Sequence, residues 1–302
     1  MSQYDLIVIG SGPAGAKGAE EAARLGKKVA LVERAPRLGG ADIATGTAPS
    51  KALREMAQYL AGLRQRSVYG LSYSLSPDLS LGDLMYRRQM VLEAEWGVIQ
   101  RNLDRYRIEI VRGEATLRDP YTVRIRAGDG RTRDLTATAI LIATGSRPYR
   151  PPQIPAGDPR LFDANSLPEM TRLPRTLVVV GGGVVGAEYA AVFAALGVSV
   201  TLAEMQDRLL PPVDAELAER CKRHLEEQGV RVILNEPVVS VETGRPQLIF
   251  QLQNGEALEG EAALVAAGRL GNTAGLGLEA AGVAVDEQGF VRVNERLQTS
   301  AP

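Results

Sequence analysis

The 302-residue sequence contains a single cysteine, Cys221, and a single histidine, His224. One cysteine excludes an internal disulfide, a thiolate metal cluster and a redox pair of neighbouring thiols, and it fits a reducing, cytoplasmic setting. His224 lies in a charged segment that is typical of a solvated surface helix. We therefore predict neither a histidine base nor a metal site.

Aromatic residues and an excess of charge of one sign are also scarce. Phe, Trp and Tyr make up 5% of the chain, and 35 Lys and Arg against 36 Asp and Glu leave a net charge of -1. A nucleic-acid binder needs a basic surface for phosphates and rings on which bases stack, so this class is not expected. No apolar run approaches the ~20 residues of a membrane-spanning helix, and the amino terminus has no signal-peptide pattern. We expect neither a nucleic-acid nor a membrane partner, and the length favours two domains.

Glycine is abundant, and it marks two segments that match each other. Each segment has an apolar run, a Gly-x-Gly-x-x-Gly turn, an Ala-rich stretch and a second apolar run that ends in a carboxylate. The glycines are Gly10, Gly12 and Gly15 in the first segment, and Gly181, Gly183 and Gly186 in the second. Glu33 and Glu204 each stand 23 positions after the first glycine of their segment. The pattern predicts a strand, a tight turn, a helix and a second strand in both copies.

We expect each glycine turn to hold the pyrophosphate of a dinucleotide. Glycine lets the backbone approach the pyrophosphate, and the helix amino terminus offers unpaired N–H groups and a positive dipole end. The carboxylates of Glu33 and Glu204 are then expected to accept hydrogen bonds from ribose hydroxyls. Arg34 and Val184 adjoin these motifs and are predicted to contact the ligands. Two such sites suggest one tightly held dinucleotide, FAD at the first turn, and one exchangeable dinucleotide at the second.

The matching continues beyond the two turns. Each copy goes on with apolar runs joined by a hairpin signal, Asp129-Gly130 in the first and Asn254-Gly255 in the second. The predicted fold class is α/β, with two Rossmann-like dinucleotide-binding domains, each a parallel sheet with a β-meander. We place an FAD-binding domain at residues 1–150, an NAD(P)-binding domain at 151–270 and an incomplete return into the first domain at 271–302. Prolines from residue 148 onward set the boundary, because proline interrupts regular structure.

An insertion at residues 49–105 lengthens the first copy and is predicted to form two helices. Ser80 and Asp83 have the spacing of a capping box for the second helix, which is expected to run past Trp96. The apolar face of the first helix is marked by Ala52, Leu53, Met56, Leu60 and Leu63.

This duplicated arrangement resembles the two-dinucleotide-fold flavoproteins, the group that includes lipoamide dehydrogenase and glutathione reductase. In that group the sequence Gly-Gly-x-Cys-x-x-x-x-Cys-x-Pro-Ser-Lys carries the redox disulfide. Residues 39–51 have the same frame, with Asp42 and Thr47 at the two cysteine positions. Without sulfur, thiol–disulfide exchange has no nucleophile and no electron reservoir besides the flavin. Disulfide reduction is therefore not expected.

Within the group, residues 45–55 and 66–70 most resemble the soluble pyridine nucleotide transhydrogenase family. That family also has Thr at the second cysteine position but usually keeps a lone Cys at the first, where this chain has Asp42. The resemblance implies hydride transfer between NADPH and NAD through FAD. Two alternatives stay open: an NAD(P)H dehydrogenase that passes electrons to a quinone or oxygen, and a nucleotide-binding fragment without turnover.

The resemblance also implies roles for individual residues. Lys51 is expected beside the flavin N5, where it stabilises the negative charge of the reduced ring, and Glu188 is expected to pair with that lysine and orient the nicotinamide. Arg269 and Asn272 resemble a signature that returns the chain to the FAD domain, an architectural role. The remaining positions expected to contact cofactor are Gly40, Thr45, Gly46, Gly113, Ala115, Ala143, Thr144, Gly145 and Gly268.

The choice between NAD and NADP stays open at the sequence level. Glu204 favours NAD, since a carboxylate repels the 2'-phosphate of NADP, and Arg208 is either a compensating cation or a solvated surface charge. In the resembling family, residues like those at 297–302 lead into a further FAD-domain strand and a dimerisation domain of a homodimer. We therefore expect a fragment that binds FAD weakly and transfers hydride poorly, with a self-sufficient NAD domain.

Overall fold

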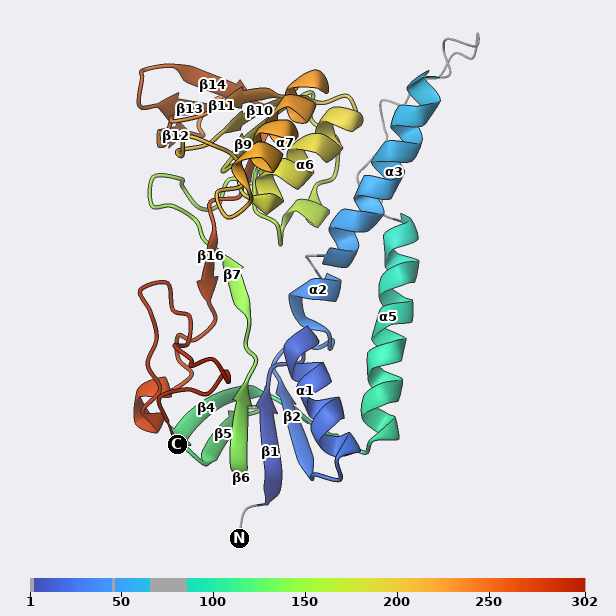
Figure 1. Ribbon diagram of the computed structural model, residues 1–302, viewed down its shortest axis with the longest axis vertical. Helices are drawn as coiled ribbons and strands as arrows, with labels where there is room; N and C mark the ends of the chain where they lie inside the picture. The colour runs from blue at the N-terminus through green and yellow to red at the C-terminus, as the bar shows by residue number, and fades with distance from the viewer. Residues whose placement is uncertain (1–2, 45–46, 66–85, 302) are drawn as a thin grey trace. The chain divides into compact units, whose positions relative to one another are not determined.

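The computed structural model describes residues 3–44, 47–65 and 86–301 (Figure 1). The chain divides into two compact units. The first unit comprises Met1–Ala44, Met90–Arg147 and Arg269–Pro302, and the second comprises Thr45–Gln89 and Pro148–Gly268. Each unit contains one copy of the repeated glycine segment.

A six-stranded sheet in the order β3-β2-β1-β6-β5-β4 forms the first unit. The first four strands of this order are parallel, and β5 and β4 extend the sheet as an antiparallel meander. The strands are β1 (Tyr4–Ile9), β2 (Val29–Glu33), β3 (Glu109–Arg112), β4 (Glu114–Asp119), β5 (Thr122–Arg126) and β6 (Thr132–Ile142). The register sets Ile7 between Ala30 of β2 and Ile140 of β6.

Both faces of the parallel strands are covered, which is why β1 and β2 are almost continuously apolar. On one face Val8 and Leu31 pack with α1 (Pro13–Arg24) and α5 (Tyr86–Arg105), which lie beside the sheet in Figure 1. On the other face Ile7 and Ile9 pack with the meander and with η3 (Leu278–Ala281). The remaining elements of this unit are α2 (Gly40–Ala44) and the strand pair β7 (Ser146–Pro148) and β16 (Arg269–Gly271).

The second unit repeats this plan. Its parallel sheet has the order β11-β10-β9-β15-β8, and a separate antiparallel sheet has the order β12-β13-β14. The strands are β8 (Leu161–Phe162), β9 (Thr176–Val180), β10 (Ser199–Ala203), β11 (Arg231–Ile233), β12 (Val238–Glu242), β13 (Leu248–Leu252), β14 (Ala257–Gly260) and β15 (Ala262–Val265). The helices are α3 (Thr47–Gln65), η2 (Leu167–Glu169), α6 (Val184–Ala195) and α7 (Ala215–Glu227).

The two hairpin turns and the surface helix occur as predicted. Gly130 and Gly255 have φ of +83° and +87°, in the turns before β6 and β14. His224 is exposed on α7. No helix within the described ranges is long and apolar enough to cross a bilayer.

The insertion contains the two predicted helices, but they belong to different units. Leu53, Ala57 and Leu60 of α3 are buried in the core that contains Phe193 of α6, so α3 packs in the second unit. Leu103 of α5 is buried in the core of the first unit. The spacing of apolar residues indicates a buried face without indicating what covers it, which is why the sequence alone assigned both helices to one domain. The capping-box residues Ser80 and Asp83 and the side chain of Leu63 lie outside the described residues.

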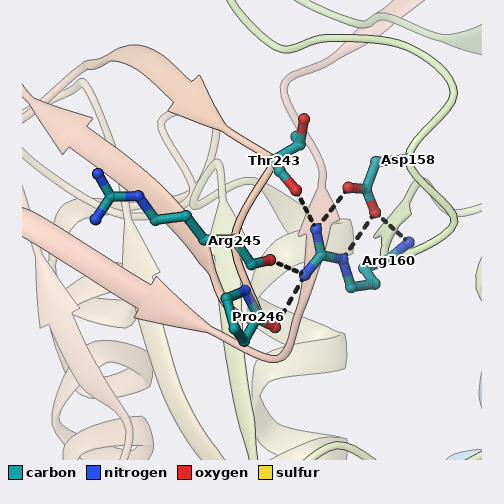
Figure 2. A network of polar contacts seen from close by, with 5 residues as sticks. All are labelled: Asp158, Arg160, Thr243, Arg245 and Pro246. Carbon is teal, nitrogen blue, oxygen red and sulfur yellow. Dashed lines mark hydrogen bonds and ion pairs between the residues drawn. The ribbon is translucent and has the colours of Figure 1, made fainter.

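A network around Arg160 fastens the loop between β12 and β13 to the rest of the second unit (Figure 2). The Arg160 guanidinium donates to both carboxylate oxygens of Asp158, at 2.9 and 2.7 Å. It also donates to the carbonyl oxygens of Thr243, Arg245 and Pro246, at 2.5, 2.9 and 3.0 Å. The hydrogen bond from Arg160 is the main reason that the pKa of Asp158 lies below its ordinary value.

Replacing Arg160 by Leu is therefore expected to destabilise the second unit by about 2 kcal/mol, because a half-buried carboxylate and three carbonyls lose a charged donor. The folded-state pKa of Asp158 is depressed, so this contribution is present above the unfolded value of 3.8 and is lost as the pH falls through the lower folded-state value. Thermal unfolding at neutral and acid pH measures both effects. Arg220→Gln, in an exposed pair with Glu216 on α7, is the control and should leave the midpoint unchanged. An equal midpoint for both variants would contradict the assigned role of Arg160.

Candidate functional site

The first glycine turn, residues 10–15, joins β1 to α1. Gly10 has φ of +102°, and a Cβ added there would lie 2.4 Å from the carbonyl oxygen of Ala143. A Cβ on Gly15 would lie 1.8 Å from the carbonyl oxygen of Gly10. The fold itself therefore requires glycine at these two positions.

The fold does not require glycine at position 12, where Gly12 is the N-cap of α1. Its φ of -64° and ψ of -179° are accessible to any residue, and an added Cβ would meet none of the described residues beyond its chain neighbours within 4 Å. As a glycine, this N-cap provides no side chain to accept a hydrogen bond from the first N–H groups of α1. By contrast, Asp214 caps α7 by accepting hydrogen bonds from the backbone N–H groups of Glu216 and Leu217. The open space at Gly12 faces a positive helix end, which is where an anionic group binds.

The second glycine turn, residues 181–186, repeats these features between β9 and α6. Gly181 has φ of +106°, and its added Cβ would lie 2.5 Å from the carbonyl oxygen of Ala266. A Cβ on Gly186 would lie 1.8 Å from the carbonyl oxygen of Gly181. Gly183 is an uncapped N-cap with φ of -70°, ψ of -174° and open space around its added Cβ. In both copies, therefore, the fold requires glycine at the first and third positions of the motif but not at the second.

Glu33 closes the first turn from the end of β2. It is buried, with 8% of its surface exposed. Its Oε2 accepts hydrogen bonds from the backbone N–H and the hydroxyl of Ser11, at 2.9 and 2.5 Å, and its Oε1 accepts one from the N–H of Ala35, at 2.8 Å. A carboxylate accepts about four hydrogen bonds, so one position remains on Oε1 for a ribose hydroxyl. Ser11 is fully buried, and no sequence signal marks it because it occupies a variable position of the glycine motif.

Glu204 has the equivalent place at the end of β10. It is buried, with 7% of its surface exposed, and it accepts hydrogen bonds from the N–H groups of Gly182, at 2.5 Å, and Gln206, at 2.8 Å. Two of its roughly four acceptor positions remain, enough for both hydroxyls of a ribose. Arg208 instead donates to the carbonyl oxygen of Pro211, at 2.6 Å. Val184, at the start of α6, is 66% exposed and leaves an apolar surface beside the turn.

Several other predicted cofactor residues surround the first turn. A Cβ on Gly40 would lie 2.9 Å from the Cα of Gly12, so this glycine packs directly against the turn. The N–H of Gly113 donates to the carbonyl oxygen of Glu33, at 3.1 Å. The amide side chain of Asn272 donates to the carbonyl oxygen of Thr144, at 3.0 Å, and so anchors the segment that follows Ala143.

Among the described residues, the other positions predicted to bind cofactor form no hydrogen bond with the glycine turns. Asn272 also donates its N–H to the carbonyl oxygen of Gly145, at 2.9 Å. Ala115 is buried in β4 and pairs with Ile125 of β5, while Arg34 is exposed just after Glu33. Gly268 follows β15 in the second unit, with φ of +111°. Thr45, Gly46 and the side chains of Asp42 and Thr47 lie outside the described residues.

Lys51 and Glu188 both lie in the second unit, on α3 and α6. Among the described residues no ion pair joins them, and Lys51 is exposed. The hydrogen bond to Glu188 comes from the preceding residue, Ser50, whose hydroxyl lies 3.3 Å from Oε1 of Glu188. Ser50 was not expected from the sequence, although it lies three positions before Leu53 on the apolar face of α3.

The geometry fits a dinucleotide at each turn. An open, uncapped helix end can hold a pyrophosphate, and the adjacent carboxylate has free acceptor positions for a ribose. The Cys221 thiol lies on α7, and burial raises its pKa above the ordinary value.

Residues 4–302 match the family model described as pyridine nucleotide-disulphide oxidoreductase. The chain belongs to this family. The family description and the names of similar proteins imply FAD and NAD(P) as the cofactors of the family. The chain is 40% identical over 300 residues to a protein from Mycobacterium bovis named soluble pyridine nucleotide transhydrogenase, and 36% identical over 296 residues to one of the same name from Colwellia psychrerythraea. These alignments cover 99% and 98% of the chain but 64% and 63% of the relatives, so the chain spans less than two thirds of their length.

Two solved structures have the same fold as this chain. The flavoprotein disulfide reductase RclA from Escherichia coli superposes with a TM-score of 0.85 at 30% sequence identity, covering 100% of the chain and 64% of that protein. LpdA from Mycobacterium tuberculosis superposes with a TM-score of 0.86 at 29% identity, covering 98% of the chain and 65% of that protein. The predicted fold class and the resemblance to the soluble transhydrogenases are thereby confirmed.

Proposed function

We propose that the chain carries the two dinucleotide sites of an FAD-dependent enzyme that transfers hydride between NADPH and NAD. The observation that carries the proposal is the pair Gly12 and Gly183. At both positions neither backbone conformation nor packing calls for glycine, and both leave an uncapped helix end open. The first turn is proposed to hold FAD and the second NAD(P).

The residues around each turn then have defined tasks. The first N–H groups of α1 and α6 hold the pyrophosphates, and Glu33 and Glu204 bind the adenosine riboses. Ser11 holds Glu33 in place through two hydrogen bonds. Gly40 packs against Gly12, and any side chain at position 40 would place its Cβ 2.9 Å from the Gly12 Cα.

Lys51 and Glu188 are proposed to act at the reacting rings, on the strength of the family resemblance. When bound, FAD accepts hydride from one nicotinamide and delivers it to another, so the reaction needs positioning and electrostatics more than acid–base groups. Lys51 supplies a positive charge that opposes the negative charge of the reduced ring. Glu188 orients the nicotinamide by accepting a hydrogen bond from its carboxamide.

We further propose that this chemistry proceeds without sulfur and that the chain does not reduce disulfides. The support is chemical: Asp42 and Thr47 occupy the positions of the redox cysteines, and Cys221 lies on α7 of the second unit. We also propose a cytoplasmic setting, supported by the single cysteine.

The test follows NADPH oxidation by the FAD-loaded chain with four acceptors in parallel: a thionicotinamide analogue of NAD, a quinone, oxygen and glutathione disulfide. Reduction of the thionicotinamide analogue in clear preference to the others is the expected result. Preference for the quinone or oxygen would favour a dehydrogenase, and binding of both dinucleotides without oxidation of NADPH would favour a non-catalytic role. Turnover of the disulfide would contradict the sulfur-free chemistry.

Glu204 is expected to make the second turn prefer NADH over NADPH. A buried carboxylate that already accepts two N–H donors cannot move away from a 2'-phosphate, so like-charge repulsion weakens NADPH binding. We expect Glu204→Gln to reduce the preference by roughly tenfold, equivalent to about 1.4 kcal/mol. Calorimetric titration of both reduced coenzymes measures the change, with Glu242→Gln on β12 as the control. An unchanged preference in Glu204→Gln would remove the carboxylate as its cause.

A further inference from the structure

We propose that Ser50 is a positioning residue for Glu188: its hydroxyl fixes one carboxylate oxygen so that the other is presented to the nicotinamide carboxamide. The inference rests on the proposed function of the second turn. It adds to that function, because it attributes the orientation of the Glu188 carboxylate to the hydroxyl of Ser50 and not to the neighbouring Lys51.

The sequence of α3 explains how Ser50 reaches α6. Ser50, Leu53, Ala57 and Leu60 are spaced by three or four residues and therefore form one stripe of the helix. All four are buried, and the three apolar members pack in the core that contains α6. Ser50 is thus the polar end of an otherwise apolar contact surface, with 5% of its surface exposed. Lys51 is one position further along and is exposed.

Glu188 needs such a partner because of its surroundings. It is the only charged residue in the twelve of α6, and its neighbours Ala187 and Tyr189 are buried. A carboxylate that is half-buried among apolar groups is costly unless hydrogen bonds satisfy it. The Ser50 hydroxyl, 3.3 Å from Oε1, provides one such hydrogen bond.

The hydrogen bond from Ser50 also restricts the conformations of the Glu188 side chain. A free glutamate side chain loses conformational entropy when it is held in one rotamer, so a carboxylate that is already held loses less when it binds the ligand. No hydrogen bond to Oε2 comes from the described residues, which leaves this oxygen as the acceptor for an N–H group of the ligand. A carboxamide is the part of a nicotinamide ring that offers such a donor.

The test combines Ser50→Ala, Ser50→Thr, Glu188→Gln and the double variant Ser50→Ala/Glu188→Gln. Stopped-flow reduction of the FAD-loaded chain by NAD(P)H gives the rate and the apparent affinity. We expect Ser50→Ala to slow flavin reduction by roughly tenfold, Ser50→Thr to restore most of the rate, and Ser50→Ala to cause no further loss in the Glu188→Gln background. Ala57→Gly, which loosens the same helix contact away from Glu188, should lower the melting temperature without slowing reduction.

Calorimetric titration of the flavin-free variants with NADH provides a second readout that needs no turnover. There too the effects of Ser50→Ala and Glu188→Gln should be non-additive. Equal slowing by Ser50→Ala in both backgrounds, or a wild-type rate in Ser50→Ala, would overturn the inference. If NAD(P)H does not reduce the flavin of the wild-type chain, the proposed function fails, and additive NADH affinities in the flavin-free cycle would then overturn the role of Ser50 separately.

Discussion

Replacing Gly12 by Val is expected to abolish FAD retention while the first unit stays folded. The backbone at Gly12 is already in a conformation that valine adopts, and an added Cβ would meet no described residue beyond its chain neighbours within 4 Å. Loss of the glycine N-cap costs about 1 kcal/mol at most. The side chain would instead displace a pyrophosphate from the N–H groups of α1. Losing two hydrogen bonds to a charged group weakens binding by about 3 kcal/mol, or roughly 100-fold.

Gly183→Val is the matched variant, because Gly183 has the same conformation and the same open space at the start of α6. It is expected to lose NAD(P)H binding while FAD is retained, whereas Gly12→Val loses FAD while NADH still binds. Gly128→Ala, in an open turn before β6, should affect neither ligand. Gly15→Ala differs from all three, since its Cβ would lie 1.8 Å from a backbone oxygen and disturb the fold itself.

The chain contains its own reporter for this experiment. Trp96, on α5, is its only tryptophan. The guanidinium of Arg37, in the loop that follows Glu33, stacks over the Trp96 ring at 3.9 Å from the ring centre. FAD bound at the first turn should quench Trp96 emission, and titration then gives the affinity of each variant. Equal quenching curves for Gly12→Val and the wild-type chain would show that the open space at Gly12 does not hold the cofactor.

Replacing Lys51 by Ala is expected to slow flavin reduction by roughly 100-fold, the usual cost of losing one preorganised charge that stabilises a developing negative charge. NAD(P)H affinity should change much less, because the lysine is exposed on α3 and takes part in no ion pair with Glu188 among the described residues. Stopped-flow traces over a range of NAD(P)H concentrations separate the limiting rate from the apparent affinity. Arg54→Ala, an exposed cation one turn further along α3, is the control for net charge. Equal limiting rates for Lys51→Ala and the wild-type chain would remove the assigned role.

The duplicated glycine turns could be predicted from the sequence because their spacing reflects local geometry. A strand, a turn and a helix of fixed length place Glu33 and Glu204 at the same position in each copy, and both are found buried there. Which of the glycines is needed for packing could not be predicted. That distinction depends on Ala143 and Ala266, which are far from the turns in the sequence.

Contacts between polar residues that are far apart in the chain also could not be predicted from the sequence. Ser11 and Ser50 are small hydroxyl residues without a spacing signal, and their importance becomes visible only when Glu33 and Glu188 are placed beside them. The partner of α3 could not be predicted for the same reason, since its apolar stripe would fit either core. In the same way, Arg160 is not distinguished from the other arginines of the chain until the β12–β13 loop surrounds it.

The central claim is that hydride passes between NADPH and NAD through FAD, with FAD at the first turn, the nicotinamide dinucleotides at the second turn and no sulfur taking part. Anaerobic mixing of the FAD-loaded chain with NADPH, followed by addition of the thionicotinamide analogue of NAD, tests it most directly. The account predicts that the visible flavin absorption bleaches with NADPH and returns as the analogue is reduced, with the cysteine variant Cys221→Ser behaving identically. A flavin that stays oxidised with NADPH, or cycling that is lost in Cys221→Ser, would contradict it.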